Sequence, residues 1–368
     1  MKASLVWDGG EDVVIPPEMG EPRKDQMLGS AGERLSELSG RVCYGSLGRG
    51  RTTDEYHAHL LQVGHGSVYE HYTRTVEISF REKFNTEILM VFQNRQGVWV
   101  EELAGTLRVT MNIRSALEWR GWTNSFISED QRYLDMSIGR MIQDLWHKEV
   151  PRIVPHASTT GIFLSPQVSE IRFVPPVSDH EKWVSLYMSG SRGFSHEQVR
   201  HGNETAISQR STRYVQESES PWVVHPLLEE YLKEDSDIVL QKQMEDVISA
   251  SQRTYDNIVV KLERWLLSRI PESDPFRKST ARKQARGAAR GFLGNALKTD
   301  MIFSASVAEW KHMCNMRAAD AADAEIRMIY NHVLLALQES RYGERFKDLS
   351  LVPASDGLGL SLKGGGAT

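Results

Sequence analysis

The feature of this 368-residue chain that most restricts its fold is an order of elements that starts again near its midpoint. The alternating stretch TRTVEISF, residues 73–80, predicts a half-buried strand and is echoed by VSEIRFVPP at residues 168–176. Helical patterns follow both stretches, and the repeating unit has the size of an ordinary domain. The sequence therefore predicts an α/β (α+β) fold made of two diverged copies, each a small mixed or antiparallel sheet flanked by long helices.

Composition and turn signals place the boundaries. Residues 1–30 are acidic and rich in proline and glycine, which predicts an irregular N-terminal arm. The first copy is expected at residues 31–160 and the second at 161–350. The glycine-rich end, residues 351–368, predicts a flexible tail.

Apart from the two strands, apolar residues recur mostly at helical spacing. Helices are expected at residues 31–46, 53–63, 84–95, 107–119, 134–150, 179–201, 241–266 and, as a pair, 298–337.

Charge and cysteine content exclude several classes of function. A net charge of −5 and a pI near 6.2 argue against general nucleic-acid binding and against attachment to a membrane surface. The two cysteines, Cys43 and Cys314, fit neither a disulfide framework nor zinc-ligand spacing and are expected in the core, so we expect no metal site. No stretch has the length of a signal peptide or a membrane span, which predicts a cytoplasmic protein.

The stretch SHEQVRHGNETAISQRSTRY, residues 195–214, concentrates arginines among hydroxyl and amide side chains. A guanidinium group matches phosphate with two parallel hydrogen bonds, so Arg200, Ser211 and Arg213 would suit a dianionic phosphate. The alternative is a solvated basic face whose arginines pair with nearby glutamates. This segment alone leaves both open. The glutamates in question are Glu197, Glu204 and Glu217.

A second pair of arginines, Arg290 and Arg317, lies downstream. Arg317 follows Trp310 and Met313 at helical spacing, which places it with an apolar face of its helix. An arginine on such a face needs an anionic or carbonyl partner. The pair therefore favours a binding site over a solvated face.

Four segments, in order, resemble signatures of the flavin-dependent thymidylate synthases. SRGFSHEQVRHGNETAISQRSTRYV resembles the family's Arg-His-Arg motif followed by Ser-x-Arg-Tyr, and GHGSVYEHYTRTVEISF resembles its His-x-Ser/Thr-Pro-Phe-Glu-His signature. TMNIRSALEW and the segment from ARGFLGNALKTD to AEIRMI resemble its Asn-Leu-Arg-Ser-Leu helix. The resemblance covers most of residues 31–335. It has departures: Gly202 replaces an arginine, Val68 a proline, and Glu197 a glutamine.

The motifs are divided between the two copies. Thr123 in the first copy replaces a base-contacting arginine, and in the second copy Ser306 and Ala308 replace the Asn-x-Arg pair. The first copy keeps the positions that the family uses mainly for flavin: His65, Ser67, Glu70, Asn112 and Arg114. The second keeps the nucleotide positions: Arg200, His201, Ser211, Arg213, Arg290 and Arg317.

The resemblance implies methylation of dUMP to dTMP, with FAD as cofactor and methylenetetrahydrofolate and NADPH as co-substrates. It implies that Arg317 and Arg200 act on the uracil ring as catalytic residues and that Arg200, Ser211, Arg213, Arg290 and Arg317 bind the substrate. The flavin would contact the five first-copy positions together with His201, Ser208 and Gln209.

Two ordinary roles compete with flavin binding in the first copy. Asn112 would serve as a helix cap, as Thr110 would, and Glu70 would pair with Arg74. The family is homotetrameric with sites between subunits, which implies a homodimer here that imitates the tetramer, with sites formed across chains. Two alternatives stay open: the same fold acting on another pyrimidine deoxynucleotide or transferring a hydroxymethyl group, and a non-catalytic paralogue that binds nucleotide or flavin.

Overall fold

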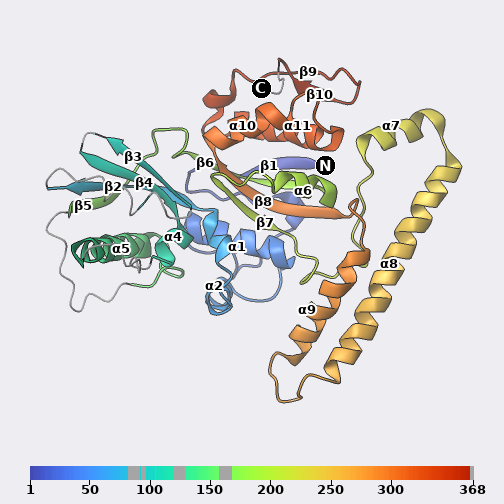
Figure 1. The fold of residues 1–368 in the computed structure, drawn as a ribbon, viewed down its shortest axis with the longest axis horizontal. Helices are drawn as coiled ribbons and strands as arrows, with labels where there is room; N and C mark the ends of the chain where they lie inside the picture. Colours follow the sequence, from blue (N-terminus) through green and yellow to red (C-terminus); the bar gives the residue numbers. More distant parts are fainter. Residues whose placement is uncertain (82–91, 93–96, 104, 120–128, 157–167, 365–368) are drawn as a thin grey trace.

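Two four-stranded antiparallel sheets organise the computed structural model of the chain (Figure 1). The structure describes residues 1–81, 92, 97–103, 105–119, 129–156 and 168–364, with only the backbone of residues 129–133. The strands are β1 (Lys2–Trp7), β2 (Thr73–Phe80), β3 (Val98–Leu103), β4 (Thr106–Asn112), β5 (Val168–Val174), β6 (Trp183–Ser191), β7 (Thr205–Gln209), β8 (Lys298–Ser306), β9 (Leu351–Pro353) and β10 (Leu360–Leu362).

The first sheet has the order β3-β4-β2-β5 and the second β7-β8-β6-β1, while β9 and β10 form a separate hairpin. All strand pairs of both large sheets are antiparallel. In each sheet a helix begins directly after the second strand of this order. Asn112 caps the helix after β4, and Ser306 caps the one after β8.

Helices surround the sheets. The α-helices are α1 (Ala31–Tyr44), α2 (Thr53–Gln62), α4 (Ile113–Leu117), α5 (Glu129–Glu149), α6 (Arg192–Gln198), α7 (Pro226–Asp235), α8 (Ile238–Leu267), α9 (Arg277–Ala289), α10 (Val307–Arg317) and α11 (Ala324–Glu339). Short 3₁₀ helices are η1 (Pro17–Met19), η2 (Gly66–Glu70), η3 (Arg290–Phe292) and η4 (Gly343–Phe346).

The second sheet lies between two helical layers, with α1 on one face and α10 and α11 on the other (Figure 1). Every residue of β6 is therefore buried, and so is nearly all of β8. The helices expected at residues 179–201 and at the start of 298–337 are wrong over these strands. The helix expected at 107–119 is likewise replaced by β4 as far as Asn112.

Three segments differ from the expected domain plan. The N-terminal arm contains β1, which pairs with β6 and so belongs to the second sheet. The strand expected to open the second copy, β5, pairs instead with β2 of the first sheet. The expected flexible tail forms the β9–β10 hairpin, in which Leu362 is buried.

The remaining helix predictions are confirmed where the structure describes the chain. At α1 a capping box joins Ser30 and Glu33, a feature that typically stabilises a helix start by about 1 kcal/mol. Gly45 ends this helix with φ of 54°, a left-handed conformation that favours glycine. The helix expected at 84–95 and the position of Thr123 lie outside the described residues, apart from residue 92.

His71 joins the two parts of the chain. It precedes β2 of the first sheet, yet its ring is completely buried against the second sheet. Its Nδ1 lies 2.7 Å from the Ser304 hydroxyl, and its Nε2 lies 2.9 Å from that of Ser208. Ser304 in turn bonds Ser185 at 2.6 Å. A buried hydrogen-bonded chain thus fixes η2 and the start of β2 onto β6, β7 and β8.

Helices α8 and α9 form a long hairpin that projects from the second sheet (Figure 1). Its buried apolar residues are few and small apart from one tyrosine: Tyr255, Val259, Ala281, Ala285 and Ala289. Within the described residues, no helix combines the length and apolarity needed to cross a bilayer.

Candidate active site

The candidate site is arranged along η2, which packs against β7. His65 directly precedes this 3₁₀ helix and Glu70 ends it. Such a helix rises about 2 Å per residue, so the two side chains are held on the order of 10 Å apart. Residues 65–70 thereby lie beside residues 205–209 of the same chain.

At the Glu70 end lies a pocket of about 210 Å³. Arg114 lines this pocket. Its Nη1 lies 2.5 Å from a Glu70 oxygen, and its Nε lies 3.0 Å from a Glu118 oxygen. Glu70 does not pair with Arg74, which bonds Glu149 instead. The lining residues are Glu70, Thr73, Gly97, Val98, Trp99, Thr110, Asn112, Arg114, Ser115, Glu118, His180, Trp183, Gly202, Glu204 and Thr205.

Asn112 has the capping role that competed with flavin binding, and it also lines the pocket. Its Oδ1 accepts a hydrogen bond from the Ser115 backbone at 2.8 Å. Gly97 allows the close approach of β3 to this side chain, because a Cβ there would lie 2.5 Å from Asn112 Nδ2. The amide group is therefore fixed in place at the pocket wall.

Other parts of the wall come from β3 and from residues 180–205, and two of these residues, Trp99 and His180, were not identified in the sequence. Trp99 stacks on His180 with ring centroids 4.1 Å apart. Glu204 accepts from His180 Nδ1 at 2.7 Å and from the Ser306 hydroxyl. Its φ of 47° is unusual for a residue with a side chain, and such strain is concentrated at functional sites. Gly202 has no atom within 4 Å of where a Cβ would lie.

Next to Gly202, His201 holds Arg317. The Arg317 Nε donates to His201 Nε2 at 2.9 Å, and its Nη1 lies 2.9 Å from Glu197. Burial, with the positive charges of Arg317 and His312, lowers the pKa of His201 to about 4. Trp310 and Met313 are fully buried on the same helix, so Arg317 does lie beside an apolar face with polar partners, as its spacing predicted.

At the other end of η2, aromatic side chains join the start of this helix to α1 and to the turn at residues 211–214. His65 Nδ1 lies 3.1 Å from the Tyr44 hydroxyl, and the Tyr44 ring packs on Tyr214 with centroids 4.7 Å apart. The Ser211 backbone donates to the Cys43 carbonyl at 3.0 Å. These contacts hold the Ser211–Tyr214 turn beside α1. Ser67 lies half-buried on η2 between the two ends.

Of the four arginines expected to bind the nucleotide, Arg317 pairs with Glu197 and the other three have no such partner in the described part of the chain. Arg200, Arg213 and Arg290 are exposed, and none forms an ion pair within the described part of the chain. The three glutamates of the alternative bind groups other than Arg200 and Arg213: Glu197 pairs with Arg317, Glu204 with His180, and Glu217 with Arg210, an arginine of the same segment.

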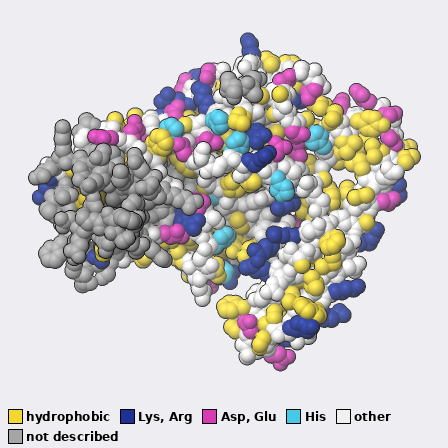
Figure 2. Space-filling model, viewed as in Figure 1, with side chains coloured by type: hydrophobic (Ala, Val, Ile, Leu, Met, Phe, Trp, Pro, Cys, Tyr) yellow, Lys and Arg dark blue, Asp and Glu magenta, His cyan; other side chains and the backbone are white. Residues whose placement is uncertain are grey.

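A further arginine, Arg192, was missed because its partners come from distant segments. It is partly buried, and burial together with the charge of Arg290 lowers its pKa, while Glu217 opposes this. Two guanidinium groups that repel each other form a site that an anion would stabilise. Figure 2 shows basic side chains gathered where the second sheet meets the α8–α9 hairpin.

Two residues that were expected to contact the flavin form hydrogen bonds with other side chains of the protein. Ser208 is buried and bonds His71, as described above. Gln209 donates from Nε2 to the hydroxyls of Ser195 at 2.9 Å and Thr299 at 3.0 Å. Both cysteines are buried, as expected.

Comparison with known proteins identifies the family of this chain. Residues 182–340 match the family described as thymidylate synthase complementing protein. A flavin-dependent thymidylate synthase of Mycobacterium sp. (strain JLS) is 33% identical over 220 residues, which cover 60% of this chain and 80% of that protein. The enzyme of Mycobacterium leprae (strain TN) is 34% identical over 192 residues, covering 52% of this chain and 69% of its own. The chain therefore belongs to the flavin-dependent thymidylate synthase family.

Proposed function

We propose that this chain methylates dUMP to dTMP with a bound FAD, using methylenetetrahydrofolate and NADPH as co-substrates. Family membership supports the reaction class. The observation that carries the proposal is a group of three arginines, Arg192, Arg213 and Arg290, that form no ion pair within the described residues of a chain whose net charge is −5. A local cationic group in an acidic protein suits a small anionic substrate.

The pocket beside Glu70 suits the ring system of a flavin. Its volume of about 210 Å³ is below the roughly 300–1,000 Å³ of typical ligand pockets, so it would take one part of a dinucleotide. Trp99 and His180 offer aromatic surface, and Arg114 is already neutralised by two carboxylates. These features favour binding of a neutral planar ring in the pocket. The diphosphate would need a cation outside it, and Arg200 is exposed two residues before the pocket residue Gly202.

When bound, the reduced flavin supplies the methylene relay and the hydride of the reaction. The chain's residues orient the groups around it. Asn112 and Arg114 would hold the ring edge, with Glu70 fixing the guanidinium in place. His65, Ser67 and His201 would line the approach from the remaining length of η2 and from the loop before β7.

The nucleotide would lie between the free arginines and Arg317. Ser211, Arg213 and Arg290 would bind the phosphate, with Arg192 behind them. Arg317, oriented by His201 and Glu197, would face the uracil carbonyls with Arg200 and stabilise the negative charge that develops as carbon 5 becomes nucleophilic.

We also propose that the chain consists of two diverged copies of one unit, a flavin side within residues 31–160 and a nucleotide side within 161–350. The matching orders β3-β4-β2 and β7-β8-β6 support this, as do the equivalent helix caps Asn112 and Ser306. The chain would form a homodimer. Exposed apolar residues on α7 and α8, among them Leu227, Ile238 and Val239, support self-association.

A non-catalytic paralogue is the second candidate, favoured by the open space at Gly202 where the family has an arginine. One experiment separates the two. Purified protein should carry FAD, its flavin absorption should shift on addition of dUMP, and it should form dTMP when given both co-substrates. A flavin spectrum that responds to dUMP without turnover would assign the paralogue, and a protein indifferent to FAD and dUMP would refute both.

A further inference from the structure

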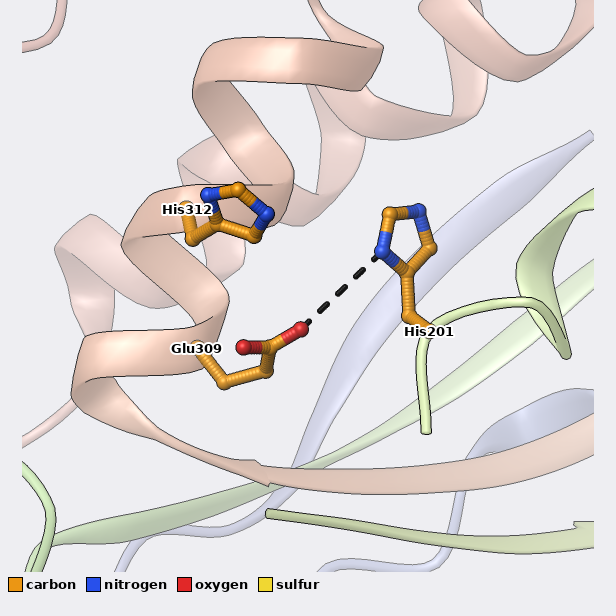
Figure 3. A group of neighbouring side chains, drawn as sticks. All are labelled: His201, Glu309 and His312. Carbon is orange, nitrogen blue, oxygen red and sulfur yellow. Dashed lines mark ion pairs between the residues drawn. The ribbon is translucent and has the colours of Figure 1, made fainter. Parts of the chain in front are cut away.

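Two histidines and one carboxylate form a cluster (Figure 3). His201 bonds Arg317 and belongs to the proposed site, whereas Glu309 and His312 have no part in the proposed reaction. Glu309 and His312 lie one turn apart on α10, and His201 faces them from the loop before β7. One ligand atom from each residue lies within 4.8 Å of the others. The His201 Nδ1 is 3.9 Å from a Glu309 oxygen.

These three groups are the donor set of a transition metal. Imidazole nitrogen combined with one carboxylate oxygen suits zinc and similar ions, whereas magnesium and calcium prefer oxygen alone. At metal–ligand distances near 2.1 Å, tetrahedral ligands lie roughly 3.3 Å apart. The three ligand atoms therefore have to move slightly closer together to bind one ion. His312 is exposed and can rotate, while the buried His201 provides a fixed point.

The surroundings supply negative charge. The Ser306 hydroxyl lies between Glu204 and Glu309. It donates to the Glu204 carboxylate and accepts from the Glu309 backbone N–H. Glu197 compensates Arg317 on the far side of His201. Two carboxylates, Glu204 and Glu309, thus lie together at the start of α10, and a cation bound there would relieve their repulsion.

We propose that His201, Glu309 and His312 bind one divalent transition-metal ion of the zinc class, with water completing its coordination. The proposal goes beyond the thymidylate synthase activity and does not rest on it. Because the expected absence of a metal site was inferred from sequence spacing alone, it could not include ligands more than a hundred residues apart.

Metal binding has a consequence for Arg317. A guanidinium only donates, so His201 Nε2 accepts and the neutral ring carries its proton on Nδ1. A metal at Nδ1 requires that nitrogen to be unprotonated, which moves the proton to Nε2. Nε2 then can no longer accept from Arg317. Metal binding and the Arg317–His201 hydrogen bond are therefore mutually exclusive.

Cobalt titration of the metal-free full-length protein tests the site. We expect one Co²⁺ per chain with the intense visible absorption of four-coordinate cobalt, displaced by Zn²⁺. His312→Ala and Glu309→Gln should each weaken binding at least tenfold, whereas His332→Ala, an exposed histidine on α11, should leave it unchanged. Absence of the four-coordinate spectrum, or equal affinity of wild type and both ligand variants, would overturn the proposal.

Nitrogen-15 NMR of the histidine rings tests the exclusivity separately. On addition of Zn²⁺, the His201 Nε2 signal should change from that of an unprotonated acceptor to that of an N–H group. The same addition to His312→Ala should leave it unchanged. An Nε2 that stays unprotonated in the zinc-bound wild type would refute the tautomer exchange.

Discussion

At the scale of single residues, the free arginines carry the strongest expectation. Arg213→Ala and Arg290→Ala should each weaken dUMP binding by about 2–5 kcal/mol, because each removes one charge from a phosphate contact that no carboxylate compensates. Calorimetry measures this directly. Arg172→Ala is the matched control, since Arg172 is exposed on the first sheet and pairs with Glu77. Unchanged dUMP affinity in both phosphate-site variants would place the site elsewhere.

Arg114 tests the flavin side of the site. Arg114→Ala should reduce the fraction of purified protein that carries FAD, because Glu70 and Glu118 would then face each other across the pocket without a cation. The ratio of flavin to protein absorbance reports occupancy, and circular dichroism reports the fold. Full occupancy in the folded variant would contradict the proposed pocket.

The sequence identified residues whose role depends on local spacing and missed those whose partners come from far away. Arg317 could be predicted because Trp310 and Met313 share its helix. Glu204 and His180 meet across 24 residues of chain, and Trp99 reaches them from another sheet. Nothing in the residues next to them along the chain indicates such pairs.

At the scale of elements, burial explains which predictions failed. β2 has partly exposed positions that keep its polar and apolar residues in alternation, so the sequence predicted it as a strand. β6 is covered by helices on both faces and has no exposed position at which to alternate. Its serines face internal partners instead, as Ser185 does with Ser304. Helices were predicted more reliably than strands, because a helical pattern in the sequence needs only one apolar face.

The junction between η2 and the second sheet should make stability depend on pH. Burial lowers the pKa of His71 to about 3, whereas an unfolded histidine titrates near 6.5. The unfolded chain therefore binds the extra proton first, so this stabilisation is complete above about pH 6.5 and is lost as the pH falls towards 3. The loss should approach about 1.4 kcal/mol per pH unit for one such histidine.

Denaturant unfolding of wild type and His71→Gln at pH 7 and pH 5 checks this. The variant removes the titrating ring and leaves a group that can hydrogen-bond at least one of the two serines. Its free energy of unfolding should therefore start lower and fall less steeply between the two pH values. Parallel pH profiles would show that His71 does not carry the dependence; His57, whose pKa burial lowers to about 4, is the next candidate.

At the scale of the whole molecule, the two halves interlock within one chain. The η2 segment of the first half packs on β7 of the second, and the pocket takes Glu70 and Arg114 from one half and Gly202 and Glu204 from the other. If the copies have specialised, each chain has one complete flavin pocket. We expect one FAD per chain, two per dimer, from mass measurement in solution combined with flavin quantitation. Two FAD per chain would contradict the specialisation.

Complementation decides whether the catalytic site also stays within a chain. Arg114 lines the pocket, and Arg317 bonds His201, the neighbour of the pocket residue Gly202. On the proposed function, both would therefore act at the same site of the same chain. When Arg114→Ala and Arg317→Ala chains are co-expressed with different tags and the mixed dimers isolated, each pocket should retain one defect, and dTMP formation should stay at the level of the parent variants. A mixed dimer that regains activity would show instead that Arg317 reaches the pocket of its partner, as sites between subunits in the family led the sequence to predict.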